Sequence, residues 1–366
     1  MGMTYEEYQT YVLENMNTVD GFSGSCVASL HKITKNNGIE LVGLSIHEPD
    51  VNISPTIYLE YYYNHLKNGT LTPEETLQAI WQVYEEHKGT RNIDVQKLLY
   101  SEESREQIYP KLINAKENQE LLKTTPHKMV EDLAVIYELE VPDVQVEGLH
   151  GNIKITDDIL DKMGMQREEL YDLAIHNAER DRPVYFSSMY DLLTNLMAED
   201  GLQEENFWQD FKETALYDNP MYVLSNTEKY NGATSLLYDN VLKECSEKCG
   251  GVDMVILPSS IHETILIPIQ EINENELSVY STMVYEVNRT NVSREERLSD
   301  TVYAYNREKD RFMTLENYVN EKNMEFQNEM KLEGFTGELS KAQEKVDLQK
   351  NKPVDIPAPN KGVERA

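Results

Sequence analysis

The chain has 366 residues, with 65 Asp plus Glu against 34 Lys plus Arg, which gives a formal net charge of −31. This excess of negative charge disfavours broad binding to nucleic-acid phosphates or to anionic lipid, because either needs a basic face. The sequence has three cysteines (Cys26, Cys245, Cys249), an acidic start, and no apolar run near the roughly twenty residues that span a bilayer, so we expect a cytoplasmic protein that crosses no membrane.

The first part of the chain reads as a mixture of helices and one hairpin. Asn37-Gly38 between two apolar runs is a strong hairpin signal, because both residue types tolerate positive φ. Thr72 and Glu75 form a capping-box pattern around a proline at the first helical position. In chain order, the patterns predict a helix over 5–16, a hairpin over 26–47, and helices over 55–68 and 73–88.

The middle of the chain reads as helical pieces from 94 to 140, broken at Pro110 and Pro126. The last piece, 127–140, carries an apolar stripe at helical spacing. Polar residues, Pro and Gly then cluster near 142–150, which predicts a domain boundary. A short strand over 152–155, a cap at Thr156 and a helix over 166–180 are expected to follow.

The C-terminal part is predicted to contain strands and helices in mixed order. The patterns indicate a strand over 221–225, a helix over 233–249, strands over 254–257 and 261–269, a helix over 277–287, and a hairpin over 302–315. This order lacks the regular alternation of a doubly wound sheet, so the fold class is α+β. We expect three parts: 1–145, an α+β part with the hairpin 26–47; 146–320, a second α+β unit; and 321–366, a solvated helix with a disordered, acidic and Pro-rich tail.

Several long phrases carry a resemblance to a known family. They include KNNGIELVGLSI, NISPTIYLEYYY, PHKMVEDLAVIYEL, NGATSLLYDNVL and ILPSSIHETILIP. In order and content they resemble the uncharacterised bacterial family catalogued as domain of unknown function 5688, from about Tyr5 to about Leu315. The resemblance implies a bacterial cytoplasmic protein, of a family abundant in anaerobic gut Firmicutes and often found on mobile elements. It implies no activity and no catalytic residue.

The segment from Ser259 through Ser260 to His262 and Glu263 is the first candidate site. A His beside a Glu at a strand entrance is suited to general-base or metal chemistry, and the serines are candidate nucleophiles. Strand alternation would place His262 and Glu263 on opposite faces, and neither a second zincin histidine nor the glycines of a nucleophile elbow are present. The alternative is a structural turn in which the hydroxyls bond to backbone amides.

A second candidate pair is His127 and Glu131, four residues apart on the predicted helix. Side chains at this spacing share one face, so with a third ligand they could hold a divalent metal. The alternative is a first-turn histidine with a solvated glutamate. Cys245 and Cys249 have the same spacing, which lacks the geometry of a CxxC motif, and we interpret them as small packing residues.

Two further segments are candidates for binding. The tyrosine run that includes Tyr61 could stack on a ligand, although its flanking charges supply no basic groove and packing also explains it. The segment from Asn226 to Gly232 joins a predicted strand to a predicted helix, where free helix amides can bind an anion.

Each of these candidate catalytic patterns lacks a required member. The leading functional hypothesis is therefore a non-enzymatic interaction protein with a protein partner of unknown identity, serving a mobile element. One alternative is a hydrolase, metal-assisted or not, that uses His262 with Glu263. A second is an acidic DNA mimic, which would need a continuous stripe of carboxylates. The sequence identifies no cofactor and no oligomeric state.

Overall fold

The computed structural model describes residues 2–49, 51, 54–88, 94–141, 151–199, 220–270, 274–328 and 330–331. It divides the chain into two compact units, residues 1–315 and 316–366. The larger unit combines helices with antiparallel sheets, which confirms the α+β class. The boundary predicted near 145 lies among residues 142–150, outside the described residues, and remains a prediction.

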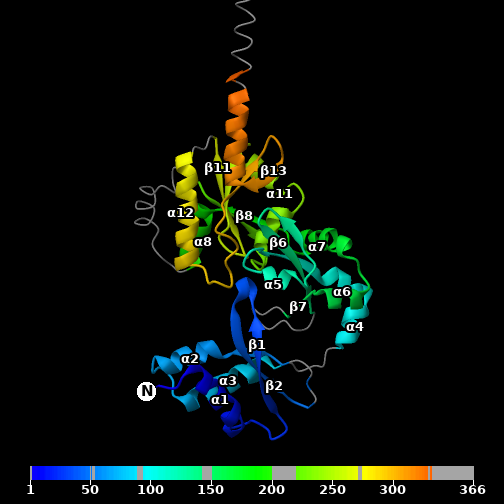
Figure 1. Cartoon of the computed structure of the whole chain (residues 1–366), viewed down its shortest axis with the longest axis vertical. Helices are drawn as coiled ribbons and strands as arrows, with labels where there is room; N and C mark the ends of the chain where they lie inside the picture. The colour runs from blue at the N-terminus through cyan, green and yellow to red at the C-terminus, as the bar shows by residue number, and fades with distance from the viewer. Residues whose placement is uncertain are drawn as a thin grey trace, which may run out of the picture. The chain divides into compact units, whose positions relative to one another are not determined.

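A three-stranded sheet and three helices form the N-terminal part of the larger unit (Figure 1). Its elements are α1 (Tyr5–Asn15), β1 (Val27–Thr34), β2 (Glu40–His47), β3 (Thr56–Tyr58), α2 (Leu59–Lys67) and α3 (Pro73–His87). The predicted hairpin is present as β1 and β2, and the capping box at Thr72 and Glu75 opens α3. Tyr8, Leu44 and Ile80 are fully buried in the shared core.

The helix predicted to begin near Pro55 starts four residues later, at Leu59. Thr56, Ile57 and Tyr58 instead pair with Ser45, Leu44 and Gly43 of β2. β-branched and aromatic side chains fit a pleated surface well, and the free edge of β2 supplies the hydrogen-bond partners. Tertiary pairing therefore sets the start of α2.

A second antiparallel sheet occupies the middle of the larger unit, with β6 hydrogen-bonded to all its other strands. Its elements are β4 (Ile108–Asn114), β5 (Lys128–Val130), β6 (Leu133–Glu140) and β7 (Asn152–Lys154). The helices of this region are α4 (Val95–Tyr100), α5 (Gln119–Leu122), α6 (Asp157–Met163) and α7 (Arg167–Asp181). The predicted strand, the cap at Thr156 and the helix after it are confirmed as β7, α6 and α7.

The prediction of a helix over 127–140 is wrong, as is the helical interpretation of 108–114. Both segments are strands, and all eight residues of β6 are buried. A continuous apolar run contains helical spacings by necessity, so periodicity alone cannot separate a buried strand from a buried helix. Here β6 pairs with β4 on one side and with β5 and β7 on the other.

A six-stranded antiparallel sheet of order β13-β12-β10-β11-β9-β8 forms the rest of the larger unit. The strands are β8 (Val184–Ser188), β9 (Tyr222–Asn226), β10 (Asp253–Leu257), β11 (Thr264–Ile269), β12 (Tyr303–Asn306) and β13 (Arg311–Thr314). The helices are α8 (Met189–Glu199), α11 (Val241–Lys248) and α12 (Glu274–Thr290), and α11 and α12 lie on opposite sides of the strands in the view of Figure 1.

Two predictions in this region need correction. The helix expected over 233–249 is divided into a 3₁₀ helix, η4 (Gly232–Leu237), and α11, because Asn240 adopts a left-handed φ of 60° between them. The strand expected over 261–269 begins only at Thr264. His262 and Glu263 therefore lie in a turn, where strand alternation does not apply.

One hydrophobic core joins the four-stranded and six-stranded sheets, with Leu112 and Val135 from the first and Leu224 and Ile256 from the second. A polar anchor reinforces this junction. Asp132, in the β5–β6 turn, accepts hydrogen bonds from the hydroxyls of Ser299 (3.2 Å), Thr301 (2.8 Å) and Tyr303 (2.6 Å). The turn between two strands of one sheet is thereby fixed to the start of β12 in the other sheet.

In the smaller unit, residues 316–328 are helical, and the side chains of Met324, Phe326 and Met330 are exposed. The tail predicted to be disordered falls largely on 332–366, outside the described residues. No helix in the described part of the chain is both long and apolar enough to cross a bilayer.

Candidate functional site

The turn that contains Ser259, Ser260 and His262 connects β10 to β11 and is held by hydroxyl groups. The Ser260 Oγ accepts a hydrogen bond from the His262 amide at 3.0 Å, and the Ser260 amide donates to the Glu263 carbonyl at 3.1 Å. From β9, the Ser225 hydroxyl donates to the His262 carbonyl at 2.7 Å. The Ser260 hydroxyl thus makes a bond to a backbone amide, as expected in the structural interpretation of this turn.

The His262 ring has a defined tautomer. Its Nδ1 accepts a hydrogen bond from the Asn231 amide at 3.2 Å, and an amide N–H can only donate. The neutral ring therefore carries its proton on Nε2, which lies 3.9 Å from the Glu296 carboxylate. Burial lowers the pKa of His262, Glu296 opposes this shift and Lys111 adds to it. His262 is thus a neutral hydrogen-bond donor near pH 7, whereas a general base would need a free lone pair on Nε2.

Glu263 does not join His262 in a catalytic pair. Burial raises the pKa of the Glu263 carboxyl, and the nearby Lys229 opposes that shift. Among the described residues, no hydrogen bond or ion pair links the side chains of Glu263 and His262. His262 and Glu263, although adjacent in the chain, thus have different charged neighbours: Glu296 for His262 and Lys229 for Glu263.

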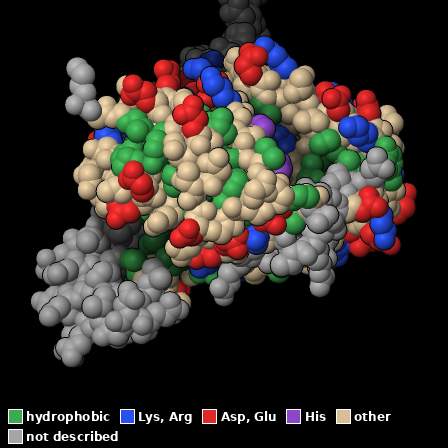
Figure 2. Space-filling view, turned by 90° about the horizontal axis from the view of Figure 1, so that it is seen from below, with side chains coloured by type: hydrophobic (Ala, Val, Ile, Leu, Met, Phe, Trp, Pro, Cys, Tyr) green, Lys and Arg blue, Asp and Glu red, His purple; other side chains and the backbone are tan. Residues whose placement is uncertain are grey.

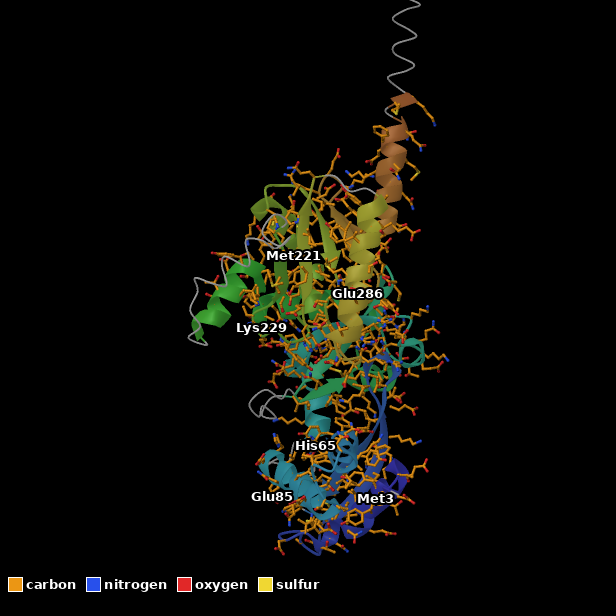
Figure 3. The ribbon with its side chains drawn as sticks, turned by 90° about the vertical axis from the view of Figure 1, so that its left-hand side faces the viewer. Met3, His65, Glu85, Met221, Lys229 and Glu286 are labelled. Atoms are coloured by element: carbon orange, nitrogen blue, oxygen red, sulfur yellow. The ribbon has the colours of Figure 1, made fainter. Side chains whose placement is uncertain are left out.

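The loop from Asn226 to Gly232 is tightly closed. The Asn226 side-chain amide donates to the Tyr230 carbonyl at 2.9 Å, and Lys229 and Asn231 have φ values of 54° and 50°. Figure 3 labels Lys229 and Met221 toward opposite ends of β9. A Cβ on Gly232 would lie 2.1 Å from Ser225 Oγ and 2.4 Å from the His262 carbonyl oxygen, so only glycine fits there.

Two backbone amides at the start of η4 already donate hydrogen bonds within the protein. Ala233 donates to the Ile261 carbonyl at 3.2 Å and Thr234 to the Asn231 carbonyl at 3.2 Å. The loop instead contributes through side chains that reach the four-stranded sheet. The Tyr230 hydroxyl accepts from Asn152 at 2.8 Å, and the Tyr230 ring lies 5.8 Å from the His262 ring.

Glu138 of β6 is the centre of this polar cluster. Its carboxylate lies 3.0 Å from Lys111 Nζ and accepts weaker bonds from Asn152 (3.3 Å) and Asn231 (3.4 Å). The Glu138 side chain is 11% exposed, so water screens its interaction with Lys111 poorly. Burial alone would lower the pKa of Lys111, but the negative charge of Glu138 outweighs burial and raises this pKa.

Lys154 of β7 lies opposite Glu138 in the pairing of β7 with β6. Its ammonium group, however, forms no ion pair with the Glu138 carboxylate. Among the described residues, no carboxylate oxygen lies within 4.0 Å of Lys154 Nζ. Burial lowers the pKa of Lys154; Glu138 opposes this shift, and the positive charges of Lys111 and Lys35 increase it. A half-buried lysine of this kind, with a perturbed pKa and charged neighbours, is a recognised mark of functional sites.

Lys35 reaches the same place from the distant N-terminal hairpin. Its Nζ lies 3.6 Å from a Glu295 carboxylate oxygen and 4.5 Å from the centre of the Tyr58 ring. The tip of the hairpin is fixed to the loop after α12, because the Asn37 side-chain amide donates to the carbonyls of Arg294 and Arg297, each at 2.8 Å. We call Lys35, Lys111 and Lys154 the lysine triad.

A family model described as a family of unknown function, DUF5688, matches residues 5–307. The chain belongs to this family. The match confirms the resemblance seen in the sequence, and it covers every residue of the lysine triad and of the His262 turn. No curated protein and no solved structure matches the chain.

The second candidate pair, His127 and Glu131, is not on a helix. His127 precedes β5 and its Nδ1 donates to the Thr125 carbonyl at 2.8 Å. Glu131 occupies the β5–β6 turn with a left-handed φ of 53°. The predicted shared helical face is therefore wrong. Across the described ranges, no three His, Cys, Asp or Glu side chains are arranged to hold a metal ion.

The remaining candidates lie in local packing environments. Tyr61 is 63% exposed on α2, and its ring contacts are with Tyr62 and His65 of the same helix. Cys245 is buried on α11, and burial raises the pKa of its thiol to about 12, which makes it an inert packing residue.

Sequence reasoning did not single out Lys111, Glu138 or Lys154. One signal was available: Glu138 and Glu140 interrupt the apolar run of β6 at alternate positions. Period-two polarity is typical of a strand with one polar face. The lysines that meet this face come from other strands, and no local pattern marks them.

Proposed function

We propose that the protein is a binding protein whose ligand carries an anionic group, held at the lysine triad. The observation that carries this proposal is the Lys154 ammonium, which is half-buried beside two other lysines and has no carboxylate oxygen within 4.0 Å among the described residues. A buried charge without a counter-ion is costly, and a bound anion would supply one.

Electrostatics favours an anion at this place despite the charge of −31 on the whole chain. Among the described residues, Lys35 lies 3.6 Å from the Glu295 carboxylate and Lys111 lies 3.0 Å from that of Glu138. Lys154 adds a positive charge that these two carboxylates do not neutralise at close range. Because the groups are partly buried, their fields act more strongly than those of the exposed acidic residues around them.

The geometry supports binding over hydrolysis. The His262 side chain is partly exposed, and its Nδ1 is occupied by the Asn231 amide, so its Nε2 carries a proton and not a lone pair. Such a group orients an anionic ligand but does not deprotonate a water. The sequence predicts an interaction protein that binds a protein partner and serves a mobile element. This role agrees with an anion site when the partner presents the anionic group.

The face in Figure 2 shows Asp and Glu side chains interspersed with Lys, Arg and apolar side chains. An acidic DNA mimic would require a continuous carboxylate stripe. This face therefore gives the mimic alternative no support, and we do not propose it.

Calorimetric titration of the full chain with phosphate, sulfate, lactate and citrate tests the proposal. We expect at least one of these anions to bind, and Lys154→Met to weaken it by about tenfold or more, equivalent to about 1.4 kcal/mol. Lys243→Met is the matched control, because Lys243 is exposed on α11. The proposal fails if no anion binds, or if the two variants lose affinity equally.

A further inference from the structure

The four-stranded sheet has a second apolar face, on the side of β6 opposite the main core. Strand alternation places Ala134 and Ile136 on this face, where they form a small core with Ile113 of β4. The helix that packs against this core, α5, is only four residues long. Beside α5 the surface is hollowed, with a volume of about 480 Å³. We call this hollow, which is lined by residues of the segment 115–123 and of the β5–β6 hairpin, the α5 groove.

Three apolar side chains line the α5 groove. Ala115 and Leu122 are partly buried against the small core, whereas Met129 is 50% exposed. Met129 lies opposite the buried Ala134 on β5, and in the described part of the chain β5 pairs with β6 alone, so β5 is an edge strand. Methionine is flexible and polarizable, which suits it to apolar partners of different shapes. The groove can therefore accept a large apolar side chain.

Two lysines also line the α5 groove. Lys116 is exposed and forms no ion pair within the described ranges. Lys123 is 64% exposed and pairs with the exposed Glu120, an interaction that contributes little stability and that a ligand carboxylate can replace. Both carboxylate oxygens of Asp132, which lines the groove as well, already accept hydrogen bonds from hydroxyls at and before the start of β12. The lysines thus provide the charges that a ligand in the groove can pair with.

We propose that the α5 groove binds a short peptide segment of a partner protein, in which a large apolar side chain is flanked by Asp or Glu. The apolar side chain contacts Leu122 and Met129, and the flanking carboxylates pair with Lys116 and Lys123. At physiological ionic strength charges farther apart than about 8 Å are largely screened, so these two lysines outweigh the more distant acidic residues of the chain.

The exposure of the groove favours a peptide over a small molecule. Pockets for small ligands enclose most of the ligand surface. Here Met129 and both lysines are open to solvent, as in a surface that receives the side chains of a larger partner. The inference is independent of the anion site proposed above, because no member of the lysine triad lines the groove.

Selection from a phage-displayed library of random nine-residue peptides, with the full chain as bait, tests the inference. We expect the enriched peptides to carry Phe, Leu, Ile or Met within two positions of Asp or Glu. Synthetic copies labelled with fluorescein are then measured by fluorescence anisotropy. Met129→Glu and Lys116→Glu should each weaken binding by about tenfold or more, equivalent to about 1.4 kcal/mol. Binding by the wild type should also weaken as the salt concentration rises.

Matched controls carry the same changes at exposed positions elsewhere. Met324→Glu in the smaller unit and Lys243→Glu on α11 should bind the peptides as the wild type does. Lys154→Met should also bind them normally, which separates this inference from the anion site. Circular dichroism confirms that each variant is folded.

Several results would overturn the inference. They are a selection that enriches no peptide, enriched peptides that lack Asp and Glu, and equal loss of binding in Met129→Glu and Met324→Glu. Loss of peptide binding in Lys154→Met would assign the peptide to the lysine triad instead. Sedimentation velocity provides the last test: a wild-type dimer that Met129→Glu dissociates would identify the groove as an interface between two copies of the chain.

Discussion

Asn37 and Asn118, 81 residues apart in the chain, hydrogen-bond to each other twice across the junction between the N-terminal hairpin and the four-stranded sheet. The Asn37 amide donates to Asn118 Oδ1 at 2.9 Å, and Asn118 Nδ2 donates to Asn37 Oδ1 at 3.0 Å. Both side chains are buried. This pair anchors the hairpin tip and so determines where Lys35 lies relative to Lys111 and Lys154.

Replacing Asn118 with Ala should destabilise the protein and weaken anion binding together. Buried polar groups of Asn37 would lose their partners, which costs about 1–3 kcal/mol of unfolding free energy. Urea denaturation and calorimetry measure the two effects. Asn68→Ala is the control, since Asn68 is exposed at the end of α2. Unchanged anion affinity in Asn118→Ala would show that hairpin docking does not shape the site.

Lys154→Met should raise the stability of the free protein. The pKa of Lys154 is lower when folded than its ordinary 10.5, because of burial and its lysine neighbours, so the charged form opposes folding. The gain should be full at neutral pH and should disappear as the pH rises above 10.5. Melting temperatures across this range check the sign. A loss of stability at neutral pH would mean that Lys154 has a stabilising partner.

His262→Gln should lose less stability than the wild type as the pH falls below neutrality. Burial lowers the pKa of His262 below its ordinary 6.5, so the unfolded chain binds more protons as the pH falls through that value. Stability of the wild type therefore decreases from pH 6.5 down to the lowered pKa. Nitrogen NMR of the ring provides a second check, with the proton expected on Nε2. A proton on Nδ1 would restore the hydrolase alternative.

Glu263→Gln should show the opposite dependence on pH. Burial raises the pKa of Glu263 above 4.5, so the charged carboxylate opposes folding at neutral pH. The variant should be more stable than the wild type near pH 7, and the difference should vanish as the pH falls below 4.5. Denaturation of His262→Gln and of Glu263→Gln across the same pH series measures the two dependences side by side. Equal slopes for both would contradict the assignment of separate environments.

Gly232→Ala should be strongly destabilising, because its Cβ would lie within 2.4 Å of both Ser225 Oγ and the His262 carbonyl oxygen. Overpacking of this kind costs about 1–3 kcal/mol. Gly24→Ala is the matched control, since a Cβ there meets no atom within 4 Å. Thermal unfolding of the two variants should give a lower melting temperature for Gly232→Ala than for Gly24→Ala. Similar melting temperatures would indicate that the His262 turn yields easily and is not a rigid support.

Local signals in the sequence predicted the elements whose ends depend on nearby residues. Thr72 and Glu75 begin α3 in both the sequence and the structure, because a capping box satisfies helix amides within four residues. Asn37-Gly38 likewise marks the hairpin, although its tip is a short 3₁₀ turn, Asn36–Gly38. What the sequence could not show is that Asn37 is also a docking residue, since its partners come from Asn118 and the loop after α12.

The segment 127–140 shows the complementary case. Its apolar residues fit a helix by spacing, and only pairing with β4, β5 and β7 makes β6 a strand. The same pairing creates the candidate site, because it aligns Glu138 beside Lys111 and opposite Lys154. The sequence by itself determined the α+β class, the caps and the turns, which depend on residues close together in the chain. The tertiary structure alone decided the site, because the lysine triad assembles only after β4 and β7 have paired with β6 and the N-terminal hairpin has docked.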